Sequence, residues 1–224
     1  QANRANEIVS GINSGIKNLK SVSDKLFSEL IKENNLAQYR KGIEELDYLS
    51  LLYIAQAYVK SGIKTEKGNV FSVNDLKAVN QRKKLTDRLQ EILSEKGLVK
   101  NSGDKTEFTE SVNTNDIEKT IIKIRDRFPE VKAELNLLTI CGDKLSEVIQ
   151  GKADPLQLLF PAGDLSQTTE LYRSSPGFSP MNIALKGVIK KIVSELPSDR
   201  KIRILELGAG TGSTSSFLFD ILPK

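Results

Sequence analysis

The chain has 224 residues, of which 38% are apolar and 28% are charged, as in ordinary globular proteins. Its formal net charge is only +4 because 33 basic residues are interleaved with 29 acidic ones, so the sequence offers weak evidence for an anionic partner. The lack of histidine and the single cysteine, Cys141, exclude an internal disulfide, a Ser-His-Asp or Cys-His catalytic site, and a zinc site built from these residue types within this chain.

The sequence contains no pattern typical of a membrane span or a secretory signal. The longest nearly apolar stretch, Leu51 to Val59, falls far short of the roughly 20 residues that cross a bilayer. The first residues also lack a charged segment followed by an apolar one. We therefore expect a cytoplasmic protein with no membrane partner and no metal.

The first third of the chain has helical periodicity. Apolar residues recur every three or four positions from Ile8 to Leu30, which predicts one long or two short amphipathic helices. This stripe consists of Ile8, Ile12, Ile16, Leu19, Val22, Leu26 and Leu30. The next segment, Gly42 to Ser61, is apolar on almost every side and predicts a helix in the centre of a bundle. Its tyrosines Tyr48, Tyr53 and Tyr58 are expected to pack in the core.

A small α/β element is predicted between residues 72 and 109. Helix-capping residues precede a short helix at Ser72–Leu76, and helical spacing from Leu85 to Leu93 ends at Gly97. Two short strands follow, at 98–100 and 106–109, separated by a polar turn. The order helix, strand, turn and strand resembles a small winged-helix unit.

A winged-helix unit can bind DNA, and the residues Gln81-Arg82-Lys83-Lys84 together with Arg88 supply positive charge. The carboxylates Asp87, Glu91, Glu95 and Asp104 are interleaved with these cations, and no aromatic residue accompanies them. This pattern favours a structural or docking wing, and we expect no nucleic-acid partner.

Two further helices are predicted over 117–128 and 131–138, separated by Pro129. Glycines and prolines then gather between Gly151 and Leu185, where a domain boundary is expected. We divide the chain into a helical domain over residues 1–150, a connection over 151–199, and a third segment over 200–224.

The third segment contains the one motif that points to chemistry. A β-branched run, Ile202 to Leu205, leads into Glu206-x-Gly208-x-Gly210-x-Gly212 and then into a predicted helix over 213–222. Open α/β sheets place nucleotide-like ligands at such a strand, glycine turn and helix. Glycines at alternate positions allow a tight turn and let a ligand lie against the backbone.

Three classes of ligand compete for this loop. A phosphate-binding Walker loop needs a lysine after its last glycine, and Ser213 follows Gly212 here. A dinucleotide fingerprint needs its third glycine at position 213, which disfavours NAD and FAD. The observed spacing is similar to the first motif of class I S-adenosylmethionine-dependent methyltransferases. This resemblance implies that Glu206, Gly208, Gly210 and Gly212 bind the cofactor, with the acid orienting its amino group.

A more specific resemblance covers about residues 143–224. The segments Gly151–Asp164 and Leu171–Pro176, Asn182 and the glycine loop together resemble the start of methyltransferase domains in modular polyketide synthases and polyketide–peptide hybrid synthetases. The resemblance implies a helical N-terminal lid, followed by the first βα unit of a truncated Rossmann-like α/β core. Residues 1–142 agree with this family only in their helical character, which matches its helical N-terminal lid.

The family resemblance also implies an activity and partners. Such a domain transfers a methyl group from S-adenosylmethionine to the α-carbon of a β-ketoacyl chain held on acyl carrier protein. Its partners would be that carrier protein, neighbouring synthase domains and the remaining methyltransferase core. The family's general base is a histidine, and this sequence has none. We therefore expect no catalytic residue in this chain and no activity from this fragment alone.

The resemblance makes Tyr172 and Asn182 candidates for the substrate tunnel, although packing is the favoured role for Tyr172. Two alternatives remain open at this point. One is an O-methyltransferase of the same assembly-line type, and the other is a helical scaffold or docking module whose glycine loop binds no ligand.

Overall fold

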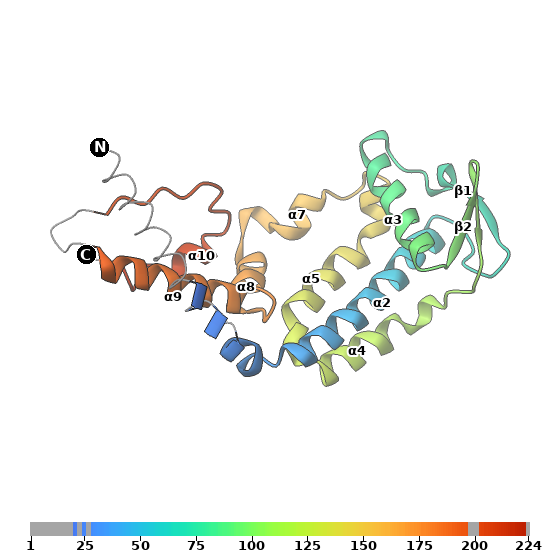
Figure 1. The fold of residues 1–224 in the computed structure, drawn as a ribbon. Coiled ribbons are helices and arrows are strands. Elements are labelled where there is room, and N and C mark those ends of the chain that lie inside the picture. The colour runs from blue at the N-terminus through green and yellow to red at the C-terminus, as the bar shows by residue number, and fades with distance from the viewer. Residues whose placement is uncertain (1–19, 22–23, 26–27, 197–201, 223–224) are drawn as a thin grey trace, which may run out of the picture. The chain divides into compact units, whose positions relative to one another are not determined.

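The computed structural model describes residues 20–21, 24–25, 28–196 and 202–222. The described chain is mainly helical and includes a three-stranded antiparallel sheet (Figure 1). It divides into two compact units, Gln38–Thr168 and Gln1–Ala37 together with Thr169–Lys224. The predicted fold class, a helical domain with a small β element, is confirmed.

The first unit, Gln38–Thr168, contains most of the elements. In chain order these are α2 (Leu36–Lys60), β1 (Val70–Ser72), η1 (Val73–Leu76), η2 (Asn80–Arg82), α3 (Lys83–Glu95), β2 (Val99–Ser102), β3 (Lys105–Phe108), η3 (Thr114–Asp116), α4 (Ile117–Arg127), η4 (Pro129–Val131), α5 (Lys132–Asp143), α6 (Leu145–Ile149), α7 (Pro155–Leu159) and η5 (Pro161–Gly163). The elements assigned to the second unit are α8 (Ser166–Ser174), α9 (Ser179–Glu195) and α10 (Ser213–Ser216).

Helix α2 is the central element of the first unit, as its apolar pattern predicts. One side of it packs with α3 and the sheet around Tyr58, and another side packs with α4 and α5 around Tyr53. The prediction for Tyr48 was wrong, because its side chain is 49% exposed.

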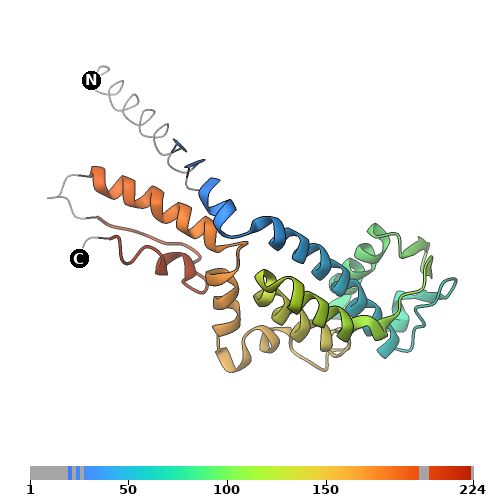
Figure 2. The same cartoon turned by 90° about the horizontal axis from the view of Figure 1, so that it is seen from below.

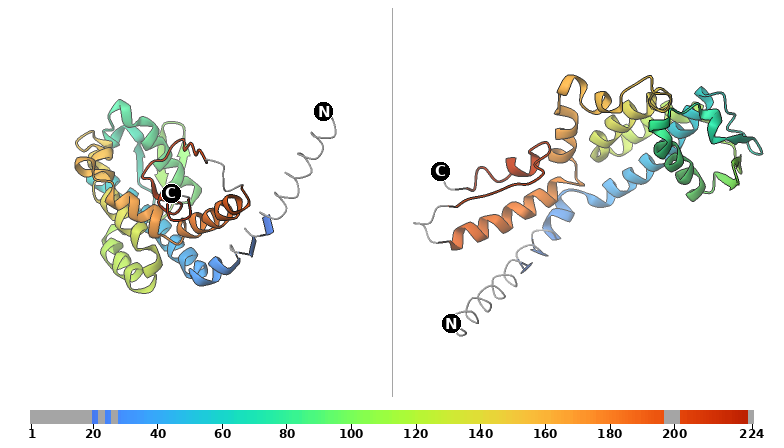
Figure 3. Two further views of the ribbon diagram at one scale, coloured as in Figure 1. Left: turned by 90° about the vertical axis from the view of Figure 1, so that its left-hand side faces the viewer. Right: turned by 90° about the horizontal axis from the view of Figure 1, so that it is seen from above.

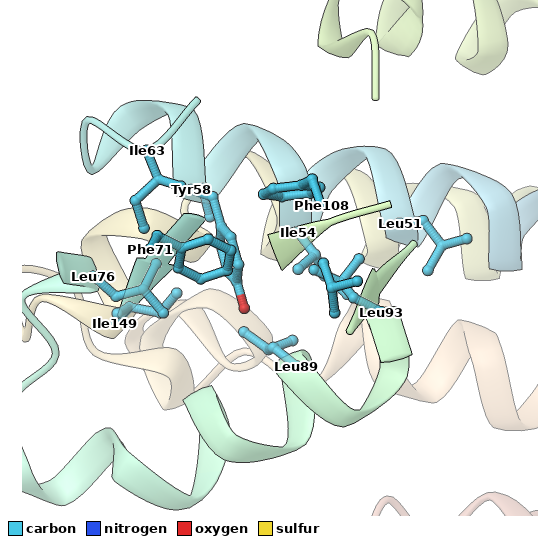
Figure 4. Close-up of a cluster of buried hydrophobic side chains, with 12 residues drawn as sticks. Leu51, Ile54, Tyr58, Ile63, Phe71, Leu76, Leu89, Leu93, Phe108 and Ile149 are labelled. Carbon is cyan, nitrogen blue, oxygen red and sulfur yellow. The ribbon is translucent and has the colours of Figure 1, made fainter. Parts of the chain in front are cut away.

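The first core cluster joins α2 to the sheet and to α3 (Figure 4). The ring of Tyr58 meets Phe71 of β1 edge to face, with the ring centroids 5.4 Å apart, and Phe108 of β3 at 6.5 Å. The second cluster is formed by α2, α4 and α5, and Figure 2 shows α2 beside α4. Polar contacts at its border include Lys123 Nζ donating to Glu45 Oε1 at 2.6 Å.

The predicted wing is confirmed as a β2–β3 hairpin. Strand β1 pairs with the other edge of β3, so the sheet order is β1-β3-β2. The hairpin turn contains Gly103, whose φ of +63° favours glycine. The predicted cap at Ser72 is also confirmed, because its hydroxyl accepts from Asn74 N while Asp75 accepts from Ser72 N.

The amphipathic stripe predicted near the N-terminus falls mostly outside the described residues. Ile8, Ile12, Ile16, Leu19, Val22 and Leu26 are among the residues not described. Leu30 lies in a helical stretch over 28–33 and is buried. Among the helices that the structure describes, none combines the length and the apolar character that crossing a membrane requires.

Candidate cofactor site

The glycine loop has the backbone conformation that its sequence predicts. Gly208, Gly210 and Gly212 have φ values of +76°, +56° and +69°, a region in which a Cβ atom is disfavoured. A Cβ placed on Gly208 or Gly212 would meet no atom within 4 Å, and one on Gly210 would meet only the Gly208 carbonyl oxygen at 3.9 Å. The loop therefore needs glycine for its backbone geometry, and its surface is open to a ligand.

The strand expected before this loop is not formed. Residues 202–206 have no strand assignment, and the side chains of Leu205 and Leu207 are 83% and 85% exposed. A parallel strand is defined by hydrogen bonds to neighbouring strands, and no strand of the described second unit is available for pairing. The helix after the loop is also shorter than expected, with four residues, Ser213–Ser216, instead of a helix reaching 222.

Hydroxyl groups tie the loop to the residues that follow it. Ser215 Oγ donates to Oε2 of Glu206, and the hydroxyls of Thr211 and Ser213 are 2.8 Å apart. The Glu206 residue is otherwise exposed, so its carboxylate retains oxygen lone pairs for a cationic group of a ligand. Glu206 and the three glycines thus lie within one short segment, as the motif requires.

The two residues considered for substrate binding lie close together at the junction of α8 and α9. The Tyr172 ring is 42% exposed and meets Phe178 edge to face, with the centroids 4.8 Å apart. The Asn182 side chain donates from Nδ2 to the backbone carbonyl of Tyr172 at 3.2 Å. Its Oδ1 accepts from Oγ1 of Thr214 at 3.0 Å. Asn182 therefore contacts the segment that carries the glycine loop.

Sequence reasoning missed a second contact between α9 and this segment. Lys186 Nζ lies 2.6 Å from Oδ2 of Asp220, and this ion pair lowers the pKa of the Asp220 carboxyl. Asn182 and Lys186 are four residues apart in α9, a spacing that places them on one helix face. Nothing in the sequence marks Thr214 and Asp220 as their partners, because 32 and 34 residues separate the pairs.

Two of the four basic residues considered for DNA binding, Lys83 and Arg88, form ion pairs with carboxylates. Lys83 lies 3.6 Å from Asp87, and Arg88 contacts Glu91 at 3.0 Å and Glu95 at 2.7 Å. A cavity of about 570 Å³ opens beside helix α3, and its lining includes Asp87, Glu91 and Asp104. These carboxylates oppose phosphate binding, so the wing favours a structural or docking role.

Comparisons with known proteins show which proteins resemble this chain in sequence and in structure. No protein-family model matches the chain. A non-reducing polyketide synthase of Penicillium brasilianum, prhL, is 30% identical over 175 residues, which is 76% of this chain and 7% of that protein. The crystal structure of the CurJ carbon methyltransferase superposes with a TM-score of 0.78 at 32% identity, covering 91% of this chain and 56% of that one.

The chain matches the N-terminal region of polyketide synthase C-methyltransferase domains. The predicted resemblance is thereby confirmed. The methyltransferase domain of the citrinin polyketide synthase has the same fold, with a TM-score of 0.83 over 93% of this chain and 56% of that one, at 23% identity. The chain spans only 4–8% of the length of the curated synthases it matches. It thus corresponds to part of one methyltransferase domain.

Proposed function

We propose that this chain supplies the helical lid and the cofactor loop of a polyketide synthase C-methyltransferase. In this proposal S-adenosylmethionine binds at Glu206, Gly208, Gly210 and Gly212, and a β-ketoacyl chain on acyl carrier protein is methylated at its α-carbon. The observation that carries the proposal is an open loop of three positive-φ glycines in a chain 32% identical to a carbon methyltransferase. The carbon acceptor is preferred over oxygen because of that relative.

The residues of the loop fit S-adenosylmethionine. Gly208 and Gly212 have no side chain, and the space beside them is open. A ligand can therefore approach the backbone N–H groups and carbonyls of the loop. Glu206 offers a carboxylate to the positively charged amino group of the cofactor. When bound, this cofactor supplies a methyl group attached to a sulfonium sulfur. The methyl carbon accepts an electron pair as its bond to sulfur breaks.

The α-carbon of a β-ketoacyl thioester is acidic because the ketone and the thioester both stabilise the carbanion. A general base must take that proton before the carbon attacks. In the family that the sequence resembles this base is a histidine, and these 224 residues contain no histidine. We therefore propose that a base outside these residues removes the proton, and that this chain alone does not transfer a methyl group. Its own contribution is to hold the cofactor and cover the site.

The partners follow from the same proposal. They are the acyl carrier protein, the rest of the methyltransferase core and the neighbouring synthase domains. The exposed side chains of Ile204, Leu205 and Leu207 support a further core, because such a run of apolar residues is normally covered by neighbouring strands. A cytoplasmic location remains a prediction.

Calorimetric titration of S-adenosylmethionine into the complete methyltransferase domain tests the proposal. Gly210→Val should abolish binding, and Gly210→Ala should weaken it, because a Cβ at this positive-φ position strains the loop. Gly103→Ala is the matched control. It introduces the same backbone strain at a φ of +63° in the hairpin of the other unit, where no predicted cofactor residue lies.

The expected result is binding by the wild-type domain and by Gly103→Ala. Unchanged affinity in Gly210→Val would show that the loop does not contact the cofactor. A folded wild-type domain without affinity for S-adenosylmethionine would favour the scaffold or docking module.

A further inference from the structure

Helix α9 and the segment with the glycine loop run side by side in the second unit (Figure 3). Two side chains of α9 contact that segment, Asn182 through Thr214 and Lys186 through Asp220. Both contacts come from one helix face and lie on the C-terminal side of Gly212. The chain that follows the loop is therefore held at two points by the same helix.

The amide of Asn182 is well suited to this position because it both donates and accepts. The carbonyl oxygen of Tyr172 can only accept, so it must face Nδ2, at 3.2 Å. That orientation directs Oδ1 toward the hydroxyl of Thr214, at 3.0 Å. Asn182 thus joins the end of α8 to the first turn after the loop, and each end of its amide already has a partner inside the protein.

Thr214 is the second residue after Gly212 and belongs to the first turn of α10. The preceding residue, Ser213, is buried, and its hydroxyl contacts Thr211 inside the loop. The next residue, Ser215, donates to Glu206 at the start of the loop. A restraint on Thr214 therefore acts on a turn whose neighbouring residues already contact both ends of the glycine motif.

We propose that Asn182 is a positioning residue that sets the conformation of the cofactor loop through Thr214. This inference rests on the proposed function and replaces a direct role of Asn182 in substrate binding. Lys186 contributes a second, weaker tether, because its partner Asp220 is 65% exposed and water and salt screen the pair.

The test uses the complete methyltransferase domain and three measurements: the dissociation constant of S-adenosylmethionine, the KM of the acyl substrate, and thermal unfolding. Asn182→Ala and Thr214→Val should each weaken cofactor binding about 5- to 20-fold, the size expected for a lost hydrogen bond in a partly buried site. The KM of the acyl substrate should stay within twofold of the wild-type value. The control, Ser194→Ala, removes a hydroxyl on α9 that donates to Lys191 O and should change neither constant.

The double variant tests whether Asn182 and Thr214 act as a pair. If Asn182 acts through Thr214, the combined substitution should weaken binding no more than either single one. Thr214→Ser keeps the hydroxyl and should restore most of the affinity lost in Thr214→Val. Asn182→Asp keeps an acceptor for Thr214 but faces a carboxylate toward the Tyr172 carbonyl, so it should lose affinity and regain part of it at low pH.

Three results would overturn the inference while leaving the proposed function intact. The first is wild-type cofactor affinity in both single variants, and the second is a rise in the KM of the acyl substrate alone. The third is additive losses in the double variant. Failure of the wild-type domain to bind S-adenosylmethionine would overturn both proposals. If Asn182→Ala unfolds, Thr214→Val and Thr214→Ser still test the inference, because they remove or keep the hydroxyl that contacts Asn182.

Discussion

Gly142 of α5 lies directly against the aromatic ring of Tyr53 in α2. A Cβ atom on Gly142 would overlap the ring atoms Cγ, Cδ1 and Cδ2 of that tyrosine. Both residues are buried, and Tyr53 belongs to the core cluster that joins α2 to α4 and α5. The close approach of these two helices therefore depends on the absence of a side chain at position 142.

This contact predicts that Gly142→Ala destabilises the first unit. Helix propensity alone predicts the opposite sign, because alanine in a helix interior is favoured over glycine by about 1 kcal/mol. Overpacking against a buried ring costs about 1–3 kcal/mol, and the ring has little freedom to move in a packed core. Chemical denaturation of wild type and Gly142→Ala measures the difference. A stabilised variant would show that the helices are not packed this closely.

Burial of Tyr53 predicts a loss of stability at alkaline pH. Burial raises the pKa of its hydroxyl from 10.0 to about 12, and the nearby Asp143 carboxylate adds to this shift. Between these pH values the unfolded chain loses the tyrosine proton and the folded chain keeps it, so the free energy of unfolding falls as pH rises. The stabilisation is complete below pH 10 and is lost as pH rises toward 12.

The variant Tyr53→Phe should reduce this alkaline slope by about 1.4 kcal/mol per pH unit, the value for one titrating proton. Urea unfolding at several pH values between 9 and 12 measures the slope. Equal slopes in wild type and Tyr53→Phe would contradict the burial of the Tyr53 hydroxyl.

Tyr58 is buried against Phe71 and Phe108, and in the described structure its hydroxyl has no hydrogen-bond partner. Figure 4 shows the hydroxyl oxygen directed toward Leu89 of α3. A buried hydroxyl without a partner loses its bonds to water and gains none in return. We therefore expect Tyr58→Phe to leave the free energy of unfolding unchanged or to raise it by up to about 1 kcal/mol.

Thermal and urea unfolding of two variants test this expectation. Tyr58→Leu removes the ring and its edge-to-face contacts, and should cost about 1–3 kcal/mol. A loss of more than about 1 kcal/mol in Tyr58→Phe would mean that the hydroxyl forms a hydrogen bond, and it would refute the arrangement around Leu89.

Much of the helical unit could be predicted from local patterns. The all-round apolar character of residues 42–61 predicted the central helix because burial on several sides needs apolar residues on several sides. The polar turn around Gly103 predicted the hairpin because its backbone conformation is local. The same holds for the glycine loop, whose three positive φ values follow from the spacing of Gly208, Gly210 and Gly212.

Other features depend on partners that lie far away in the sequence. The exposure of Tyr48 depends on which positions of α2 the other elements leave uncovered, and periodicity cannot select them in a helix that is apolar on almost every side. The run at Ile202–Leu205 has a strand composition, but strand formation requires a neighbouring strand to hydrogen-bond with.

The sequence by itself determined the helical character of the chain, the wing and the glycine motif, because each is encoded in residues close together. Only the tertiary structure decided that Asn182 contacts Thr214 and that Gly142 meets Tyr53. These pairs are 32 and 89 positions apart, and a contact at such separation arises from the packing of whole helices. That packing is a collective property of the fold, which no single motif encodes.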